Sequence, residues 1–142
     1  MIPYGRQDIS ESDIEAVVKV LRSDFLTQGP AVTRFERAVA DKVGASFALA
    51  TNSATSALHL ACLALDLGQG DLLWTTPVTF VASANCGIYC GAEGDFVDID
   101  PDTYNLCPTA LALKLEEAKR SGRLPKVVVA VHLCGQSCEM QA

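Results

Sequence analysis

Small hydroxyl and amide side chains are concentrated in the segment TNSATS, residues 51–56, which lies between an apolar run and a helical repeat of Ala and Leu. At a strand-to-helix turn, small residues let backbone N–H groups approach an anion, and Ser and Thr hydroxyls add donors. The helix macrodipole adds roughly half a positive charge at the same point. The segment therefore predicts a site for a phosphate-sized anion. Ordinary capping of the helix by Ser53 or Thr51 is the alternative explanation.

A second stretch, TTPVTFVASAN at residues 75–85, also follows an apolar strand-like run. It places Phe80 shortly after Pro77, at the opening of the next helical segment. In α/β proteins, ligands bind at the carboxyl ends of the strands, and an aromatic ring there can stack on a flat heterocycle. Packing of Phe80 in the core is the competing interpretation. Neither stretch has the glycine pattern of a P-loop or of a dinucleotide fingerprint, which disfavours a simple Rossmann-type binder.

The remaining titratable side chains have mostly structural explanations. Four aspartates in DFVDIDPDTYN, residues 95–105, are typical of a strand end followed by a solvated turn: Asp95, Asp98, Asp100 and Asp102. His59 lies beside an apolar helical line and is predicted to pack or be solvated. His132 ends the apolar run KVVVAV, and for this residue ligand contact and a structural role stay equally open.

Composition and charge limit the classes of function that the chain could have. The chain has 142 residues, is 49% hydrophobic and carries a formal net charge of −6, which predicts one globular domain and disfavours an extended nucleic-acid surface. We find neither an apolar stretch of about 18 residues nor a secretory leader, so no membrane span and a cytoplasmic location are expected. The six cysteines lack C-x2-C spacing and are interpreted as reduced, buried thiols without a metal.

Hydrophobic periodicity predicts the order of elements. A capping box at Ser10 begins a helix that ends near Ser23, a loop covers residues 24–30, and a second helix stops at Gly44. Strands are then predicted at 46–50, 71–75, 93–98 and 126–131, alternating with helices at 53–67, 78–90 and 108–121. This alternation indicates a mostly parallel sheet covered on both faces. Because KVVVAV is too apolar for an uncovered sheet edge, we expect that the chain is truncated after it.

Together, the ordered motifs LTQGP, TNSATSAL, TTPVTFVASAN, FVDID and VVVAVHLCGQ resemble the DegT-type sugar-nucleotide aminotransferases, pyridoxal-phosphate enzymes of the aspartate aminotransferase fold. The resemblance runs over essentially the whole chain. It implies an α/β fold that is an incomplete large domain of the type-I transferases, with an arm and substrate loop at residues 1–30 and an α/β region at 31–142. The most similar subgroup is the UDP-4-amino-4,6-dideoxy-N-acetyl-β-L-altrosamine transaminases of pseudaminic-acid biosynthesis.

The resemblance also assigns roles residue by residue. Ala54 and Thr55 match positions that hold the phosphate of pyridoxal 5′-phosphate, and Phe80 matches the aromatic residue that stacks on its pyridine ring. The positions that would touch the nucleotide sugar are Tyr4, Asp24, Phe25, Leu26, Thr27 and Ser53. The implied reaction is transfer of an amino group, with glutamate as the expected donor, to the keto carbon of a nucleotide-linked 4-keto-6-deoxy sugar by a homodimer.

Two catalytic groups of the family have no counterpart in this chain. The enzymes use a lysine that forms the Schiff base and an aspartate against the pyridine nitrogen, and both are expected beyond the KVVVAV strand. None of the chain's five lysines matches that lysine: Lys19, Lys42, Lys114, Lys119 and Lys126. We therefore expect an inactive fragment of such an enzyme. The alternative is a non-catalytic module that pairs with a full-length paralogue.

Overall fold

The structure is a computed structural model that describes residues 5–142. The predicted substrate contact Tyr4 lies outside the described residues. The chain divides into two compact units, Met1–Ala50 and Thr51–Ala142.

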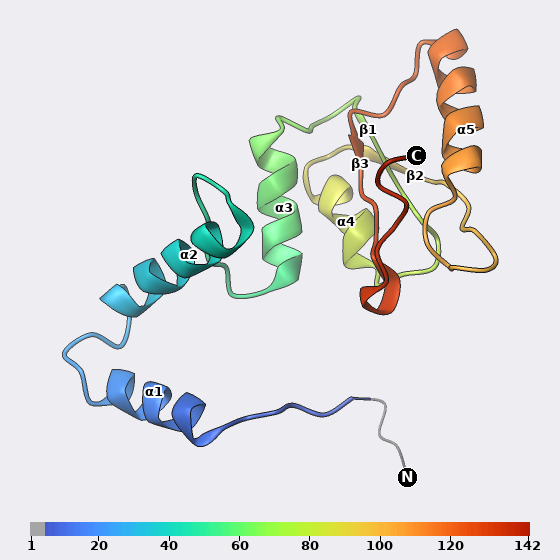
Figure 1. Cartoon of the computed structure of the whole chain (residues 1–142). Helices are drawn as coiled ribbons and strands as arrows, with labels where there is room; N and C mark the ends of the chain where they lie inside the picture. Colours follow the sequence, from blue (N-terminus) through green and yellow to red (C-terminus); the bar gives the residue numbers. More distant parts are fainter. Residues whose placement is uncertain (1–4) are drawn as a thin grey trace. The chain divides into compact units, whose positions relative to one another are not determined.

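The first unit contains the two predicted leading helices, α1 (Glu11–Leu21) and α2 (Pro30–Val43) (Figure 1). The capping box of α1 is confirmed: Ser10 N–H donates to the Asp13 carboxylate at 2.8 Å, and the Ser10 hydroxyl accepts from Asp13 N–H at 3.4 Å. These bonds lower the pKa of Asp13, and the bond from the Ser10 backbone has the largest effect. The predicted stop of α2 is also confirmed, because Gly44 has φ 69°, the left-handed conformation that favours glycine.

The strand predicted at residues 46–50 is wrong, since this segment has an irregular backbone. One hydrogen bond connects this segment to α2: the N–H of Ala50 donates to Glu36 Oε1 at 2.9 Å. Phe47 and Leu49 are 91% and 75% exposed. An apolar run becomes a strand only where a neighbouring backbone accepts its hydrogen bonds, and the described residues provide no such neighbour here.

The second unit is built on a parallel sheet of three strands in the order β2-β1-β3. The strands are β1 (Leu72–Thr75), β2 (Glu93–Phe96) and β3 (Val127–Val128). Leu73 of β1 lies opposite Gly94 of β2 on one side and opposite Val127 of β3 on the other. The predicted parallel sheet is therefore confirmed, with β1 at its centre.

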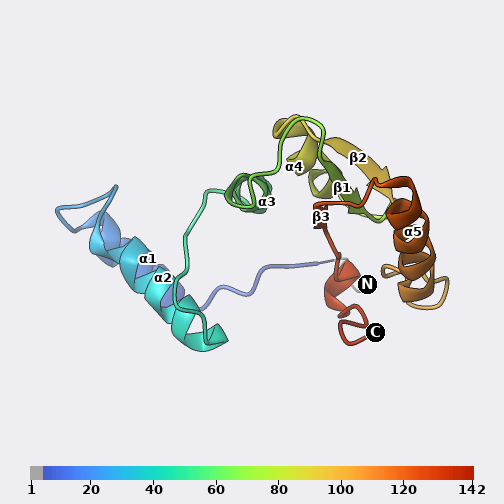
Figure 2. The ribbon, with the colours of Figure 1, turned by 90° about the horizontal axis from the view of Figure 1, so that it is seen from above.

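Helices cover both faces of this sheet (Figure 2). They are α3 (Ala54–Ala64), α4 (Ala82–Tyr89) and α5 (Pro108–Ser121). Leu73 packs with Cys62 of α3 and Cys86 of α4, whereas Trp74 packs with Ala118 of α5 on the opposite face. Successive strand residues point to opposite faces, so β1 contributes to two separate apolar clusters. The predicted α/β class is confirmed, and Trp74 lies in the core.

Several predicted elements are shorter than expected. Helix α3 ends at Ala64, α4 begins at Ala82, and β3 is two residues long. Backbone bonds from Lys126 N–H to Leu72 O and from Val129 N–H to Trp74 O flank β3. Because β1 ends at Thr75, residues beyond this point have no ladder to join on that side. The extent of β3 is therefore set by its neighbour and not by the apolar run. No helix among residues 5–142 is long and apolar enough to cross a membrane.

Gly87 provides a test of the packing between α4 and β1. A Cβ added at Gly87 would lie 3.0 Å from Leu73 Cβ and 3.1 Å from Leu73 Cδ1. Alanine in a helix interior is ordinarily about 1 kcal/mol better than glycine, but overpacking a filled core costs about 1–3 kcal/mol. We therefore expect Gly87→Ala to lower the urea midpoint of the chain.

Gly94→Ala is the matched control for this substitution, because a Cβ there meets nothing within 4 Å. Its urea midpoint should stay close to that of the unchanged chain. A raised midpoint for Gly87→Ala would show that α4 does not pack against Leu73 as described.

Candidate functional site

The amino terminus of α3, the loop after β1 and the loop after β3 all lie at the carboxyl edge of the parallel sheet. The carboxyl ends of β1 and β3 share this edge because the strands run in the same direction. Helix α3 leads through residues 65–71 into the amino end of β1, so its own first turn lies at the opposite, carboxyl end (Figure 1). This is the edge at which open α/β sheets bind ligands.

The first turn of α3 is arranged as a partly satisfied helix terminus. Ser53 is the N-cap, and its hydroxyl accepts from Ser56 N–H at 3.2 Å. The Ser56 hydroxyl donates to Asn52 Oδ1 at 2.7 Å, and the Thr51 hydroxyl donates to Ser53 O at 2.9 Å. Capping by Ser53 is therefore confirmed, whereas Thr51 does not cap the helix.

Capping leaves two donors available. Within the described part of the chain, the N–H groups of Ala54 and Thr55 donate to no other protein group. The first N–H groups of a helix carry partial positive charge and point out of the helix end. Thr55 is half-buried and adds a hydroxyl, and Ala54 is exposed. Two free N–H groups, one hydroxyl and small side chains fit a phosphate group.

Phe80 lies in the turn that joins β1 to α4, and it is 73% exposed. Core packing, the alternative explanation of this residue, is wrong in this structure. An exposed phenyl ring at the carboxyl edge is available to a flat ligand. The structure thus places Ala54, Thr55 and Phe80 at one edge of one unit, and their joint contact with a single ligand stays a prediction.

The predicted sugar-binding residues are divided between the two units. Asp24, Phe25, Leu26 and Thr27 form an exposed loop after α1, whereas Ser53 opens α3 in the unit of residues 51–142. All four loop side chains are exposed. Their joint role with Ser53 stays a prediction.

His132 and its surroundings show a feature that the sequence pattern did not reveal. His132 is exposed at the end of the β3 segment, and its Nδ1 accepts from Cys138 N–H at 3.0 Å. Asn105, a buried residue of the FVDIDPDTYN region, holds the same loop by three hydrogen bonds. The signal in the sequence is weak, since one polar residue between Tyr104 and Leu106 resembles any turn asparagine.

The structural explanations of the other polar residues are largely confirmed. Asp100 Oδ1 accepts from the N–H groups of Asp102 and Thr103, as expected for a turn aspartate. The His59 ring packs edge-on against Tyr89, with 5.4 Å between ring centroids. Among the residues the structure covers, no group of three side chains could hold a metal ion.

All six cysteines are free thiols, as expected, but their burial varies. Cys62, Cys86 and Cys138 are buried, and desolvation raises the pKa of Cys62 to about 12. Cys134 is exposed, contrary to the prediction, because it lies in the surface loop after β3 with a left-handed φ of 54°.

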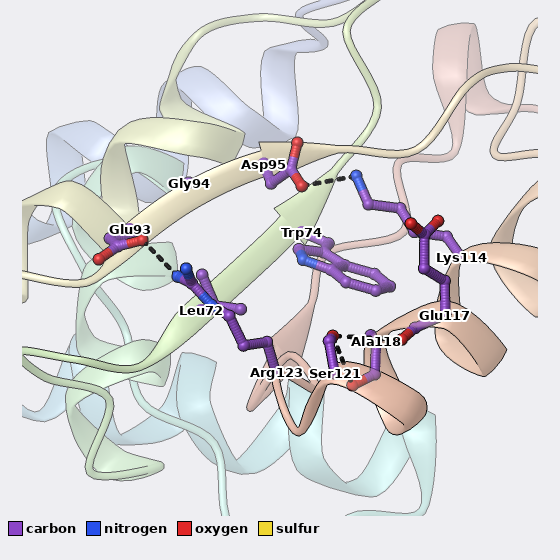
Figure 3. A pocket seen from close by; sticks show the side chains of 10 residues that line it. All are labelled: Leu72, Trp74, Glu93, Gly94, Asp95, Lys114, Glu117, Ala118, Ser121 and Arg123. Atoms are coloured by element: carbon purple, nitrogen blue, oxygen red, sulfur yellow. Dashed lines mark hydrogen bonds and ion pairs between the residues drawn. The ribbon is translucent and has the colours of Figure 1, made fainter.

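A second concave region lies on the α5 face of the sheet, with a volume of about 440 Å³ (Figure 3). Two ion pairs cross it: Lys114 Nζ to Asp95 Oδ2 and Arg123 Nη2 to Glu93 Oε2, each at 2.7 Å. Lys114 Nζ also lies 4.8 Å from the centre of the Trp74 ring. The hydrogen bond from Lys114 is the main cause that lowers the pKa of Asp95 below 3.8. These contacts attach α5 and the segment that follows it to β2, and they have a structural role.

The pH dependence of stability tests the bond between Asp95 and Lys114. A carboxyl group with a lowered pKa in the folded state stabilises above its unfolded pKa of 3.8 and loses this effect as the pH falls through the folded value. Because the Asp95 side chain is 54% exposed, solvent screening limits the effect to about 0.2–1 kcal/mol. We expect Asp95→Asn to lower the urea midpoint at pH 7 and to lower it less at about pH 3, which is below the unfolded pKa of 3.8.

Glu93→Gln serves as the control, since the side chains of Glu93 and Arg123 are 65% and 61% exposed and such a pair contributes little. The same loss of midpoint for Asp95→Asn at both pH values would rule out the ionic explanation.

The profile of the DegT/DnrJ/EryC1/StrS aminotransferase family matches residues 7–142. The Bacillus subtilis protein EpsN, whose name assigns it provisionally to the pyridoxal phosphate-dependent aminotransferases, is 46% identical over 125 residues, which are 87% of this chain and 32% of EpsN. The UDP-4-amino-4,6-dideoxy-N-acetyl-β-L-altrosamine transaminase of Campylobacter jejuni (strain 81-176) is 39% identical over 146 aligned residues, covering 99% of this chain and 36% of the enzyme.

Among solved structures, Helicobacter pylori PseC, an aminotransferase involved in the biosynthesis of pseudaminic acid, superposes with a TM-score of 0.86 at 33% identity. The match covers 98% of this chain and 36% of PseC. The chain thus spans about a third of the length of the relatives it matches.

Proposed function

Because the chain belongs to the DegT/DnrJ/EryC1/StrS aminotransferase family, we propose that it forms the cofactor-phosphate side of a sugar aminotransferase. The family depends on pyridoxal phosphate. When bound, this cofactor supplies an electron sink for the transfer of an amino group. The observation that carries the proposal is the pair of free N–H groups at Ala54 and Thr55, at the sheet edge that also bears the exposed ring of Phe80.

In this proposal the residues of the chain bind and orient. The N–H groups of Ala54 and Thr55 and the Thr55 hydroxyl donate to the phosphate oxygens, where the α3 dipole also favours negative charge. The Phe80 ring covers one face of the heterocycle and excludes water from it. Ser53 lies next to the phosphate donors, so the same turn can contact cofactor and sugar substrate.

The proposed substrate is a nucleotide-linked 4-keto-6-deoxy sugar of the altrosamine type, with glutamate as the amino donor. Support comes from the names of the C. jejuni transaminase and of H. pylori PseC and from the exposed loop of residues 24–27. We further propose that the enzyme acts as a homodimer in pseudaminic-acid biosynthesis.

The lysine and the carboxylate that this chemistry needs are proposed to lie outside residues 1–142. Two lysines of the sheet unit are already engaged, since Lys114 pairs with Asp95 and Lys126 Nζ bonds to Asp71 Oδ2 at 2.9 Å. Residues 1–142 alone are therefore proposed to be inactive. Reading the coding sequence past Ala142 tests this: an aspartate on a following strand and a later lysine support the enzyme, whereas a stop codon there favours a non-catalytic partner of a full-length paralogue.

Binding of pyridoxamine 5′-phosphate tests the site itself, since this form of the cofactor has no aldehyde to react with surface lysines. We expect Phe80→Ala to weaken binding about two- to tenfold, because loss of an aromatic contact costs about 0.5–1.5 kcal/mol. The substitution should leave the urea midpoint nearly unchanged, because Phe80 is exposed. The measurement is a fluorescence titration of the chain with the ligand.

Phe47→Ala is the matched control, because it removes another exposed phenyl ring that the proposal does not use. Thr55→Val removes one hydroxyl donor with little change in side-chain shape. It should also weaken binding relative to the unchanged chain. Equal affinity for all four proteins would overturn the proposed site.

A further inference from the structure

Asn105 is a buried polar residue whose side chain bonds to a distant part of the chain. It is 3% exposed. Its Nδ2 donates to Gln136 O at 3.0 Å and to Ser137 O at 3.2 Å, and its Oδ1 accepts from Leu133 N–H at 3.0 Å. All three bonds go to main-chain atoms of one segment, so both amide donors and the carbonyl are satisfied by a single loop.

The segment that Asn105 holds is the loop after β3, residues 132–138. It contains a short 3-10 turn, Leu133–Gly135, in which Cys134 has φ 54° and Gly135 has φ 85°. A left-handed conformation costs about 1–2 kcal/mol for a residue other than glycine. A loop with such a residue persists when bonds from elsewhere determine its course, and the three bonds from Asn105 do this.

His132 begins this loop, and its ring orientation is set within it. Nδ1 accepts from Cys138 N–H at 3.0 Å, and Cys138 Sγ donates to Val131 O at 3.2 Å. A ring nitrogen that accepts an N–H bond carries no proton, so the proton of the neutral ring is on Nε2. Over residues 5–142, Nε2–H has no acceptor. His132 therefore offers one donor at the carboxyl edge of the sheet.

We propose that Asn105 is a positioning residue that fixes the loop 132–138, so that His132 presents Nε2–H to an acceptor oxygen of the bound phosphopyridine cofactor. The inference rests on the proposed function, because the ligand is the one assigned to this edge. The inference adds His132 to the residues that bind the cofactor. Asn105 acts indirectly, because it orients the His132 ring.

The experiment uses the chain labelled with 15N, because His59 and His132 are its only two histidines. Two-bond 1H–15N spectra identify the protonated ring nitrogen of each. We expect His132 in the Nε2–H form and, in Asn105→Ala, a mixture of both forms. His59 should keep its spectrum, since it packs on Tyr89 away from the loop. An unchanged His59 also shows that the variant is folded.

Gln136→Ala and Ser137→Ala are the matched controls, because Asn105 bonds to the main-chain carbonyls of these residues and not to their side chains. Both should keep His132 in the Nε2–H form. The inference is overturned if Asn105→Ala leaves the His132 signals unchanged. It is also overturned, without any variant, if His132 in the unmodified chain is in the Nδ1–H form.

Addition of pyridoxamine 5′-phosphate separates this inference from the proposed function. We expect shifts at the Thr55 amide and at His132 Nε2, and an affinity three- to tenfold lower in Asn105→Ala. Shifts at Thr55 without any at His132 would overturn the ligand role of His132 and leave the phosphate site intact. If neither signal moves, the proposed function fails and with it this ligand role.

Discussion

The parallel pairing of β1 with β2 on one side and β3 on the other determines where the candidate functional groups of residues 51–142 lie. Since the strands run in one direction, the loops that follow β1 and β3 leave the sheet at the same edge. Leu73 and Trp74 point to opposite faces and anchor α3 and α4 on one side and α5 on the other. The first turn of α3 is brought to the carboxyl edge by that anchoring, because the helix runs back to the amino end of β1.

Elements that depend on local chemistry could be predicted closely from the sequence. The capping box at Ser10, the left-handed stop at Gly44 and the helix Pro108–Ser121 follow from neighbouring residues alone. Strands were predicted less well, because their hydrogen bonds go to residues that a local pattern does not contain. Residues 46–50 and 126–131 have similar apolar runs, yet only the second contains a strand, β3, which is two residues long.

The same distinction applies to the candidate site. The anion-binding role proposed for Ser53, Ala54 and Thr55 could be predicted from the sequence, because a helix terminus with small polar residues has an intrinsic affinity for anions. The exposure of Phe80 could not be decided from the sequence, since a phenylalanine after an apolar strand is as compatible with a core as with a ligand edge. Asn105 could not be found at all, because its three partners are 28 to 32 residues away and are main-chain atoms.

The distribution of apolar surface connects the fold with the proposed function. Phe35, Phe47 and Leu49 are largely exposed in one unit, and exposed apolar area costs about 25 cal/mol per Å² relative to burial. By contrast, Leu73 and Val97 beneath the candidate site are fully buried. The two apolar clusters that contain Leu73 and Val97 therefore support the carboxyl edge of the sheet.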